Sequence, residues 1–190
     1  MIINRSFNDF KFRHRDKKNQ IIYTSQKVKN DNDISNLIDN FLLEKNSFIF
    51  ESVEKGKDKG RYSFCGYQEI DKILLTNNIL SYSRGRSKKK SDLGVKGLNK
   101  INEIIKKNKF EKNKSLPPMS SAYFGFIGYE NIKRIENISK TKKKSDLKIP
   151  DILLFLPKFI LILDNQKNIF YIIQHVDFTN NNNLNFEDLK

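Results

Sequence analysis

Four polar side chains of different chemistry lie in two short stretches, Glu51-Ser52 and Arg61-Tyr62. The first pair ends the apolar stretch SFIFES and the second begins RYSFCG, with a charged, glycine-bearing loop between them. Both stretches are typical of strands, and pairing them would bring a carboxylate, a hydroxyl, a guanidinium and a phenol ring together. That set suits a small zwitterion, with Glu51 facing its ammonium group and Arg61 or Ser52 facing its carboxylate.

The alternative without a ligand is an exposed Glu51–Arg61 ion pair across two strands. Such a pair contributes only about 0–1 kcal/mol to stability. Considered without any comparison, the residues favour this alternative over a ligand site.

Other residue types offer little catalytic chemistry. The sequence contains no P-loop, GxSxG, HExxH or paired-carboxylate motif, and the glycines of YFGFIGYE do not fit the dinucleotide fingerprint. His14 is expected at the surface, and His175 at the surface or a strand edge. Cys65 is the single cysteine, which excludes an intramolecular disulfide and fits a reducing cytoplasm. Its strand pattern predicts a small buried side chain rather than a nucleophile.

The net charge of +14 is concentrated in two stretches of the chain. Residues 84–114 carry 12 basic and 3 acidic side chains, and residues 133–148 carry 7 and 2. A basic chain can bind nucleic acid through phosphate neutralisation, but 29 of the 36 basic residues are Lys rather than Arg. Solvated Lys-rich loops are therefore the favoured interpretation, with a nucleic-acid surface as the alternative.

The hydrophobic pattern predicts an α+β fold with a largely antiparallel sheet and inserted helices. Ile34, Leu37, Ile38, Phe41 and Leu42 form a helical stripe that Asp33 would cap, and a second helix covers 95–105. Asn77-Asn78 is expected to close a hairpin. The expected strands are 20–26, 47–52, 61–66, 69–75, 79–83, 121–127, 152–155, 159–164 and 169–176, with a short helix at 130–136.

The length of 190 residues favours one domain. We expect a loose arm at 1–19, a folded domain at 20–176 and an Asn-rich tail or linker at 177–190. No apolar run approaches the roughly 20 residues that span a bilayer, and no signal peptide is recognised, so a cytoplasmic protein is expected.

Three blocks of the sequence resemble the N-terminal region of anthranilate synthase component I, a chorismate-utilising family. They are FIFESVEKGKDKGRYSFCG, SAYFGFIGYENIKRIE and IPDILLFLPKFILILDNQKNIFYIIQHV, which together span Phe48 to Val176 in the family's order. The resemblance identifies 20–176 as a domain of this type. It implies a sandwich of antiparallel β-sheets with inserted helices.

The family's enzyme is a lyase of tryptophan biosynthesis, which converts chorismate to anthranilate and pyruvate. The resemblance implies a glutamine amidotransferase component II as partner, Mg²⁺ in the full-length enzyme and feedback inhibition by L-tryptophan. Carried onto this sequence, the tryptophan site comprises Glu51, Ser52, Arg61 and Tyr62.

The catalytic chorismate-binding module lies C-terminal in the family and is expected to be missing from this chain or encoded separately. The chain would then hold no catalytic or metal-binding residues, need no cofactor of its own and make no anthranilate alone. The alternatives are the equivalent part of aminodeoxychorismate synthase component I, in folate biosynthesis, and a non-catalytic interaction module or gene fragment.

Overall fold

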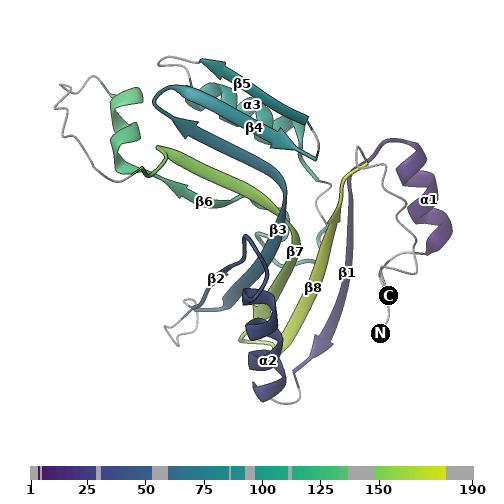
Figure 1. The fold of residues 1–190 in the computed structure, drawn as a ribbon. Helices are drawn as coiled ribbons and strands as arrows, with labels where there is room; N and C mark the ends of the chain where they lie inside the picture. Colours follow the sequence, from purple (N-terminus) through teal and green to yellow (C-terminus); the bar gives the residue numbers. More distant parts are fainter. Residues whose placement is uncertain are drawn as a thin grey trace. The chain divides into compact units, whose positions relative to one another are not determined.

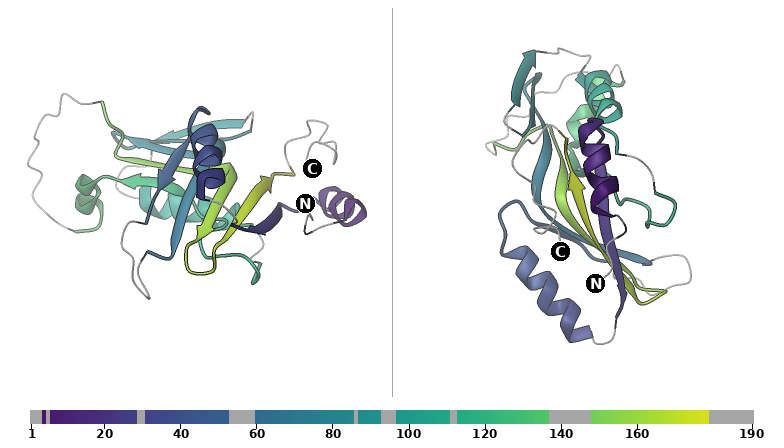
Figure 2. Two further views of the ribbon diagram at one scale, coloured as in Figure 1. Left: turned by 90° about the horizontal axis from the view of Figure 1, so that it is seen from below. Right: turned by 90° about the vertical axis from the view of Figure 1, so that its right-hand side faces the viewer.

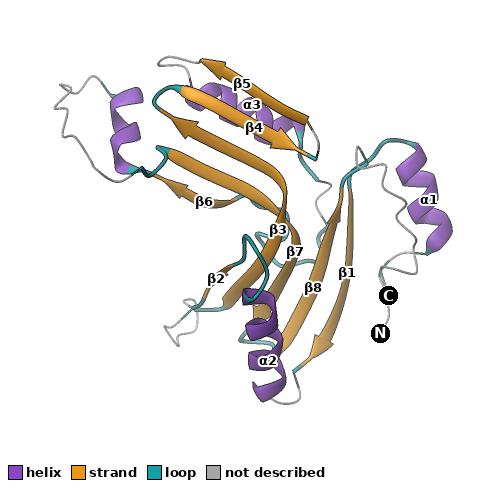
Figure 3. Ribbon diagram, in the orientation of Figure 1, coloured by secondary structure: helices purple, strands orange, loops and turns teal. Residues whose placement is uncertain are grey.

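The computed structural model is a mostly antiparallel β-sheet with a few helices (Figures 1 and 3). It describes residues 4, 6–28, 31–52, 60–85, 87–92, 97–110, 113–136 and 148–178. The chain divides into two compact units. Unit 1 comprises residues 1–70, 110–122 and 157–190, and unit 2 comprises residues 71–109 and 123–156.

The helices are α1 (Phe7–Arg15), α2 (Asp31–Leu42), α3 (Gly97–Lys107) and the 3₁₀ helix η2 (Tyr129–Arg134). The strands are β1 (Gln20–Lys27), β2 (Phe48–Phe50), β3 (Tyr62–Thr76), β4 (Ile79–Arg84), β5 (Ser87–Asp92), β6 (Phe124–Ile127), β7 (Ile152–Asp164) and β8 (Ile169–Val176). None of the helices in the described ranges has the length and apolar character that crossing a bilayer requires.

In unit 1 the strands follow the order β1-β8-β7-β3-β2. β1 pairs antiparallel with β8 over its whole length, from Gln20 opposite Val176 to Lys27 opposite Ile169. The β7–β8 turn at 165–168 sets Asp164 opposite Ile169. Figure 1 shows these strands side by side, and Figure 2 shows α1 next to the start of β1.

The core of unit 1 is built from the apolar faces of its strands. Ile21, Ile160, Ile162 and Ile173 are all buried. α2 brings its apolar stripe to the same unit, where the Phe41 and Tyr67 rings form an edge-to-face pair with their centroids 4.7 Å apart. The tyrosine in turn stacks on Phe159.

His175 lies inside this core on β8, which pairs with β1 on one side and β7 on the other. The expected surface or strand-edge position was therefore wrong. Its Nδ1 lies 2.7 Å from the carbonyl oxygen of Pro157, and its Nε2 lies 2.8 Å from that of Ser120. Burial lowers the pKa of His175, and the two carbonyl contacts act in the opposite direction without offsetting it.

In unit 2 the strands follow the order β6-β7-β3-β4-β5. Asn77 and Asn78 turn β3 into β4 with φ values of 49° and 73°, as the predicted hairpin requires. α3 covers one face of this sheet (Figure 1), because its apolar stripe packs on the strands. Ile101 joins the buried core with Ile73, Leu75, Leu80 and Ile152.

A buried carboxylate, Asp71, organises a polar network beside this core. It accepts hydrogen bonds from Arg84 Nη1 at 3.1 Å, from the Tyr123 hydroxyl at 2.5 Å and from the Tyr82 hydroxyl at 3.4 Å. Asn108 Nδ2 donates to the Tyr82 hydroxyl at 2.6 Å. Burial, followed by the nearby Asp71 charge, raises the pKa of both tyrosines, which keeps them protonated as donors.

Most of the predicted elements are confirmed, with differences in extent. α2 begins at Asp31, so Asp33 lies within the helix and not at its N-cap. The two strands predicted at 61–66 and 69–75 form one continuous β3, and those on either side of Pro157 form one β7. The sandwich arrangement is not confirmed, because the described strands join a single sheet.

Two elements were not predicted. α1 lies in the segment expected to be a loose arm, where Phe10 is buried and its carbonyl oxygen accepts a hydrogen bond from Gln20 Nε2 at 3.1 Å. β5, with the sequence SKKKSD, has no hydrophobic pattern at all. The boundaries of the three predicted regions stay predictions, and residues 179–190 of the predicted tail lie outside the described residues.

Candidate functional site

The Glu51-Ser52 pair follows directly after β2, in unit 1. β2 pairs antiparallel with β3, with Phe48 opposite Gly66 and Phe50 opposite Phe64. The structure therefore confirms the predicted pairing of the two stretches. Glu51 is exposed and Ser52 is half-buried. Residues 53–59 of the predicted glycine-bearing loop lie outside the described part of the chain.

A hydrogen-bonded junction holds Ser52 against the start of β3. The backbone N–H of Ser52 donates to the Ser63 hydroxyl oxygen at 3.2 Å. The same oxygen accepts from Asn165 Nδ2 at 3.4 Å, and that amide also donates to the carbonyl oxygen of Gly60 at 3.1 Å. The backbone N–H of Asn165 donates to the carbonyl oxygen of Arg61 at 2.8 Å. The β7–β8 turn thus ties both ends of the loop to one point.

Arg61 does not pair with Glu51; its partner is Asp164, at the end of β7. Arg61 Nε lies 3.1 Å from Asp164 Oδ1, and Nη2 lies 2.8 Å from Oδ2, which is a bidentate arrangement. The Asp164 side chain is buried, whereas that of Arg61 is one-third exposed. The predicted Glu51–Arg61 pair is therefore wrong, because a buried carboxylate already occupies the Nε and Nη2 edge of the guanidinium.

The hydrogen bonds around Asp164 favour its charged form. Burial alone would raise its pKa, but the hydrogen bonds from Arg61 and from the backbone amides of Lys167 and Gln166 outweigh burial and hold the pKa below its ordinary value. The same hydrogen bond raises the pKa of Arg61. The pair is therefore fully ionised at neutral pH.

The lowered pKa of Asp164 predicts an acid-dependent loss of stability. The carboxylate stabilises the folded chain above its unfolded pKa of about 4, and this contribution is lost as the pH falls through its folded pKa. We expect the urea midpoint to fall below about pH 4, and to fall less steeply in Asp164→Asn. A matched control is Asp16→Asn, because Asp16 pairs with the exposed Lys18 at a distance of 3.7 Å. Equal slopes for Asp164→Asn and the unaltered chain would contradict the assignment.

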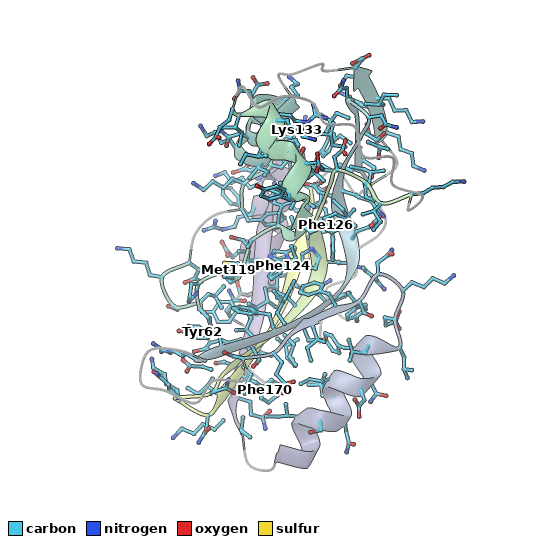
Figure 4. The ribbon with its side chains drawn as sticks, turned by 90° about the vertical axis from the view of Figure 1, so that its left-hand side faces the viewer. Tyr62, Met119, Phe124, Phe126, Lys133 and Phe170 are labelled. Atoms are coloured by element: carbon cyan, nitrogen blue, oxygen red, sulfur yellow. The ribbon has the colours of Figure 1, made fainter. Side chains whose placement is uncertain are left out.

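Aromatic rings lie on both strands of the site. The Arg61 guanidinium lies over the Tyr62 ring at 4.8 Å from its centroid, and the Tyr62 and Phe64 centroids are 6.2 Å apart. On β2 the Phe48 and Phe50 rings are 5.5 Å apart, and Phe50 is exposed. Figure 4 labels Tyr62 among the side chains of unit 1. The site thus combines exposed aromatic surface with a carboxylate and a guanidinium.

The structure places three of the four predicted residues around one junction. Arg61 and Tyr62 are in contact, Ser52 is linked to them through Ser63, and Glu51 is exposed next to Ser52. Sequence reasoning missed Asp164 and Asn165, which lie about 100 positions away along the chain. Their signal was the Asp-Asn pair between two apolar strands, a typical turn sequence.

The described residues offer no metal centre. No three His, Cys, Asp or Glu side chains within the described ranges gather as a metal ion would require. Cys65 is buried, as predicted, and burial raises the pKa of its thiol to about 11, so it is not a reactive thiolate at neutral pH.

Comparison with known proteins gives a consistent picture. The chain is 26% identical over 166 residues to anthranilate synthase component 1 of Cereibacter sphaeroides. It is 28% identical over 127 residues to the same protein of Mycolicibacterium smegmatis, and 29% identical over 136 residues to that of a serogroup C strain of Neisseria meningitidis. The predicted resemblance to anthranilate synthase component I is confirmed. No family model matches the sequence.

The similarity covers much of this chain but only a part of each relative. The Cereibacter alignment includes 85% of this chain and 33% of the relative, and the Mycolicibacterium alignment includes 67% and 24%. A crystal structure of anthranilate synthase component I from Streptococcus pneumoniae TIGR4 superposes with a TM-score of 0.54 at 21% identity. That superposition covers 72% of this chain and 31% of the other. The chain therefore spans a third or less of the relatives it matches and shares the fold of that part.

Proposed function

We propose that this chain is the N-terminal regulatory part of anthranilate synthase component I, and that it binds the feedback inhibitor L-tryptophan at Glu51, Ser52, Arg61 and Tyr62. The observation that carries the proposal is the junction of Ser52, Ser63 and Asn165, which fixes the end of β2 beside an aromatic surface. A fixed backbone is what selective recognition of a small ligand needs, because it lowers the ordering cost of binding.

The side chains of the site match the groups of an aromatic amino acid. The exposed Glu51 carboxylate would accept hydrogen bonds from the ammonium group. The ligand carboxylate would take the Arg61 Nη1 edge, which Asp164 leaves open, and the Ser52 hydroxyl. The indole ring would pack on the aromatic surface of Phe50 and Tyr62. Asp164 would act as a positioning residue by holding the guanidinium.

The proposed partners follow from the same assignment. A chorismate-binding module would supply the reaction of chorismate to anthranilate and pyruvate, and a glutamine amidotransferase component II would supply ammonia. We assign the Mg²⁺ of the full-length enzyme to that module, because the described residues of this chain offer no group of ligands for it. The role of this chain is then to bind the inhibitor and to transmit the inhibition to the chorismate-binding module.

Calorimetric titration of L-tryptophan into the chain mixed with a chorismate-binding module tests the site. We expect Ser52→Ala and Glu51→Ala each to weaken binding about tenfold, since each removes a hydrogen bond to a charged group of the ligand. Ser47→Ala is the matched control: its hydroxyl donates to the Leu42 carbonyl oxygen at 3.1 Å, before β2 begins. Unchanged affinity in both site variants would refute the assigned site.

A further inference from the structure

The two faces of the β4–β5 strand pair in unit 2 differ in character. α3 covers one face (Figure 1), where Leu80 and Tyr82 of β4 pack in the core that Ile101 of α3 joins. Side chains of a strand alternate between the faces, so the odd-numbered residues of β4 lie on the face away from α3. They are Ile79, Ser81 and Ser83.

The register of β5 brings two lysines to the face away from α3. Ser83 lies opposite Lys88 and Ser81 lies opposite Lys90, and directly opposite residues of an antiparallel pair share one face. Along each strand the two side chains are about 7 Å apart, because a strand rises about 3.4 Å per residue. We call Ser81, Ser83, Lys88 and Lys90 the β4–β5 face. The sequence favoured solvated loops for these lysines, whereas the structure fixes them in a paired strand.

None of the four side chains of the β4–β5 face has a hydrogen-bond or ion-pair partner among the described residues. Lys88 and Lys90 are exposed, and Ser81 and Ser83 are half-buried. Like charges that are neighbours on one face of a sheet repel each other. An anion that bound between the two ammonium groups would relieve this repulsion and would accept hydrogen bonds from both hydroxyls.

Positive charge predominates around the β4–β5 face. β3 adds Lys72 to the row of Ser83, and Asp92 follows Lys90 two positions later on the same face. The rows that the three strands form on this face therefore contain three lysines and one carboxylate. Unit 2 as a whole contains 18 Lys and Arg against 7 Asp and Glu, a surplus of 11 out of the chain's 14. Such a field attracts a polyanion.

Protection of the sheet edge is the simpler explanation for a lysine-rich β5, because charged side chains discourage the addition of a further strand. That explanation treats Lys88, Lys89 and Lys90 alike. It also gives no role to the hydroxyls of β4. Lys89 lies opposite Tyr82, on the face that α3 covers, so it discriminates between edge protection and a ligand on the β4–β5 face.

The composition of the face selects the kind of anion. Lysine ammonium groups and serine hydroxyls are donors that contact nucleic-acid phosphates. The rows that β3, β4 and β5 form on this face include no aromatic side chain, whereas proteins that bind single strands stack bases on aromatic rings. A duplex keeps its bases paired and presents its phosphates outward, which suits a flat face of this composition.

From these observations we propose that the β4–β5 face binds the phosphate backbone of a double-stranded nucleic acid without reading its sequence. The ammonium groups of Lys88 and Lys90 would contact neighbouring phosphates, and the hydroxyls of Ser81 and Ser83 would donate to their oxygens. The proposal concerns unit 2 alone and does not depend on the tryptophan site of unit 1.

Fluorescence anisotropy of the full chain with a labelled DNA duplex of about 20 base pairs tests the proposal. We expect the logarithm of the affinity to fall linearly with the logarithm of the salt concentration, and duplexes of unrelated sequence to bind equally. A single strand of the same length should bind about tenfold more weakly, because the face offers its bases no aromatic surface.

Lysine substitutions separate the β4–β5 face from the general charge of unit 2. Lys88→Gln combined with Lys90→Gln should weaken duplex binding about tenfold and lower the salt slope by about 2, since each lysine on a phosphate accounts for about 1. Lys106→Gln combined with Lys107→Gln is the matched control, because it removes the same charge from exposed positions of α3. That control and Lys89→Gln should leave the slope unchanged.

A serine substitution tests the face without altering the net charge. Ser81→Ala combined with Ser83→Ala should weaken duplex binding about tenfold, because it removes two hydrogen bonds to charged oxygens. Circular dichroism of all the variants checks that the fold is retained.

Several results would overturn the proposal. They are no duplex binding at low salt, equal losses in the two lysine pairs, or unchanged affinity in the serine pair. Equal binding of the single strand would reject a duplex as the ligand. Binding of vesicles that contain anionic lipid, with no binding of the duplex, would assign the face to a membrane surface instead.

Discussion

Replacing Arg84 by alanine is expected to lower the free energy of unfolding by about 3–5 kcal/mol. The Asp71 side chain is fully buried and that of Arg84 is 9% exposed, so the substitution leaves a carboxylate in the protein interior without its cation. The Tyr82 and Tyr123 hydroxyls still donate to Asp71, but hydrogen bonds from neutral groups do not replace a full positive charge.

Urea unfolding followed by circular dichroism measures this effect. Arg13→Ala is the matched control, because its pair with Asp9 at 3.1 Å is part-exposed on one helix and should contribute only about 0.2–0.5 kcal/mol. Adding Asp71→Asn to Arg84→Ala should restore part of the loss, since it removes the uncompensated charge. A shift in Arg84→Ala no larger than in Arg13→Ala would show that the pair does not stabilise the fold.

Gly125→Ala is expected to destabilise the protein by about 3 kcal/mol or more, from backbone strain and lost strand pairing. Gly125 has φ of 142°, a region that side chains rarely allow, and an added Cβ would lie 1.9 Å from the Leu153 carbonyl oxygen. Since that oxygen belongs to the backbone of β7, the clash is relieved only by moving β6 away from its partner strand.

Thermal unfolding measures this effect, and Gly128→Ala is the control variant. Gly128 has an ordinary φ of −63°, and an added Cβ would lie 3.1 Å from the nearest atom, the Asp151 carbonyl oxygen. Its substitution should lower the melting temperature much less than that of Gly125. Similar losses in the two variants would mean that β6 tolerates a side chain at Gly125 and that its approach to β7 is not tight.

The elements that sequence reasoning predicted well are those with a one-sided apolar pattern. α2 and the β3–β4 hairpin formed as expected, because the stripe from Ile34 and the turn at Asn77-Asn78 are local signals. β5 carries no such signal: three successive lysines disfavour a strand, and pairing with β4 overrides that preference. α1 was missed because, among its described side chains, Phe10 is the one that is buried.

Only the part of the candidate site whose residues lie close together in the chain could be predicted from the sequence. The β2–β3 pairing brought Ser52 beside Ser63, as the two strand patterns required. The partner of Arg61 was not predictable from local pattern, because Asp164 lies 103 positions away and reaches the site only through the register of β7. Glu51 and Arg61 have opposite charges and lie ten positions apart in the sequence, yet Arg61 pairs with the buried Asp164.

The boundary between the two units has a consequence for the order in which the chain folds during synthesis. The polypeptide crosses that boundary four times, between residues 70 and 71, 109 and 110, 122 and 123, and 156 and 157. All the residues of unit 2 have been synthesised once Leu156 has been added. β1, by contrast, pairs with β8, so Gln20 cannot pair until Val176 has been synthesised, 156 residues later. On the ribosome, the basic unit is expected to fold first, while the N-terminal strand remains without its partner.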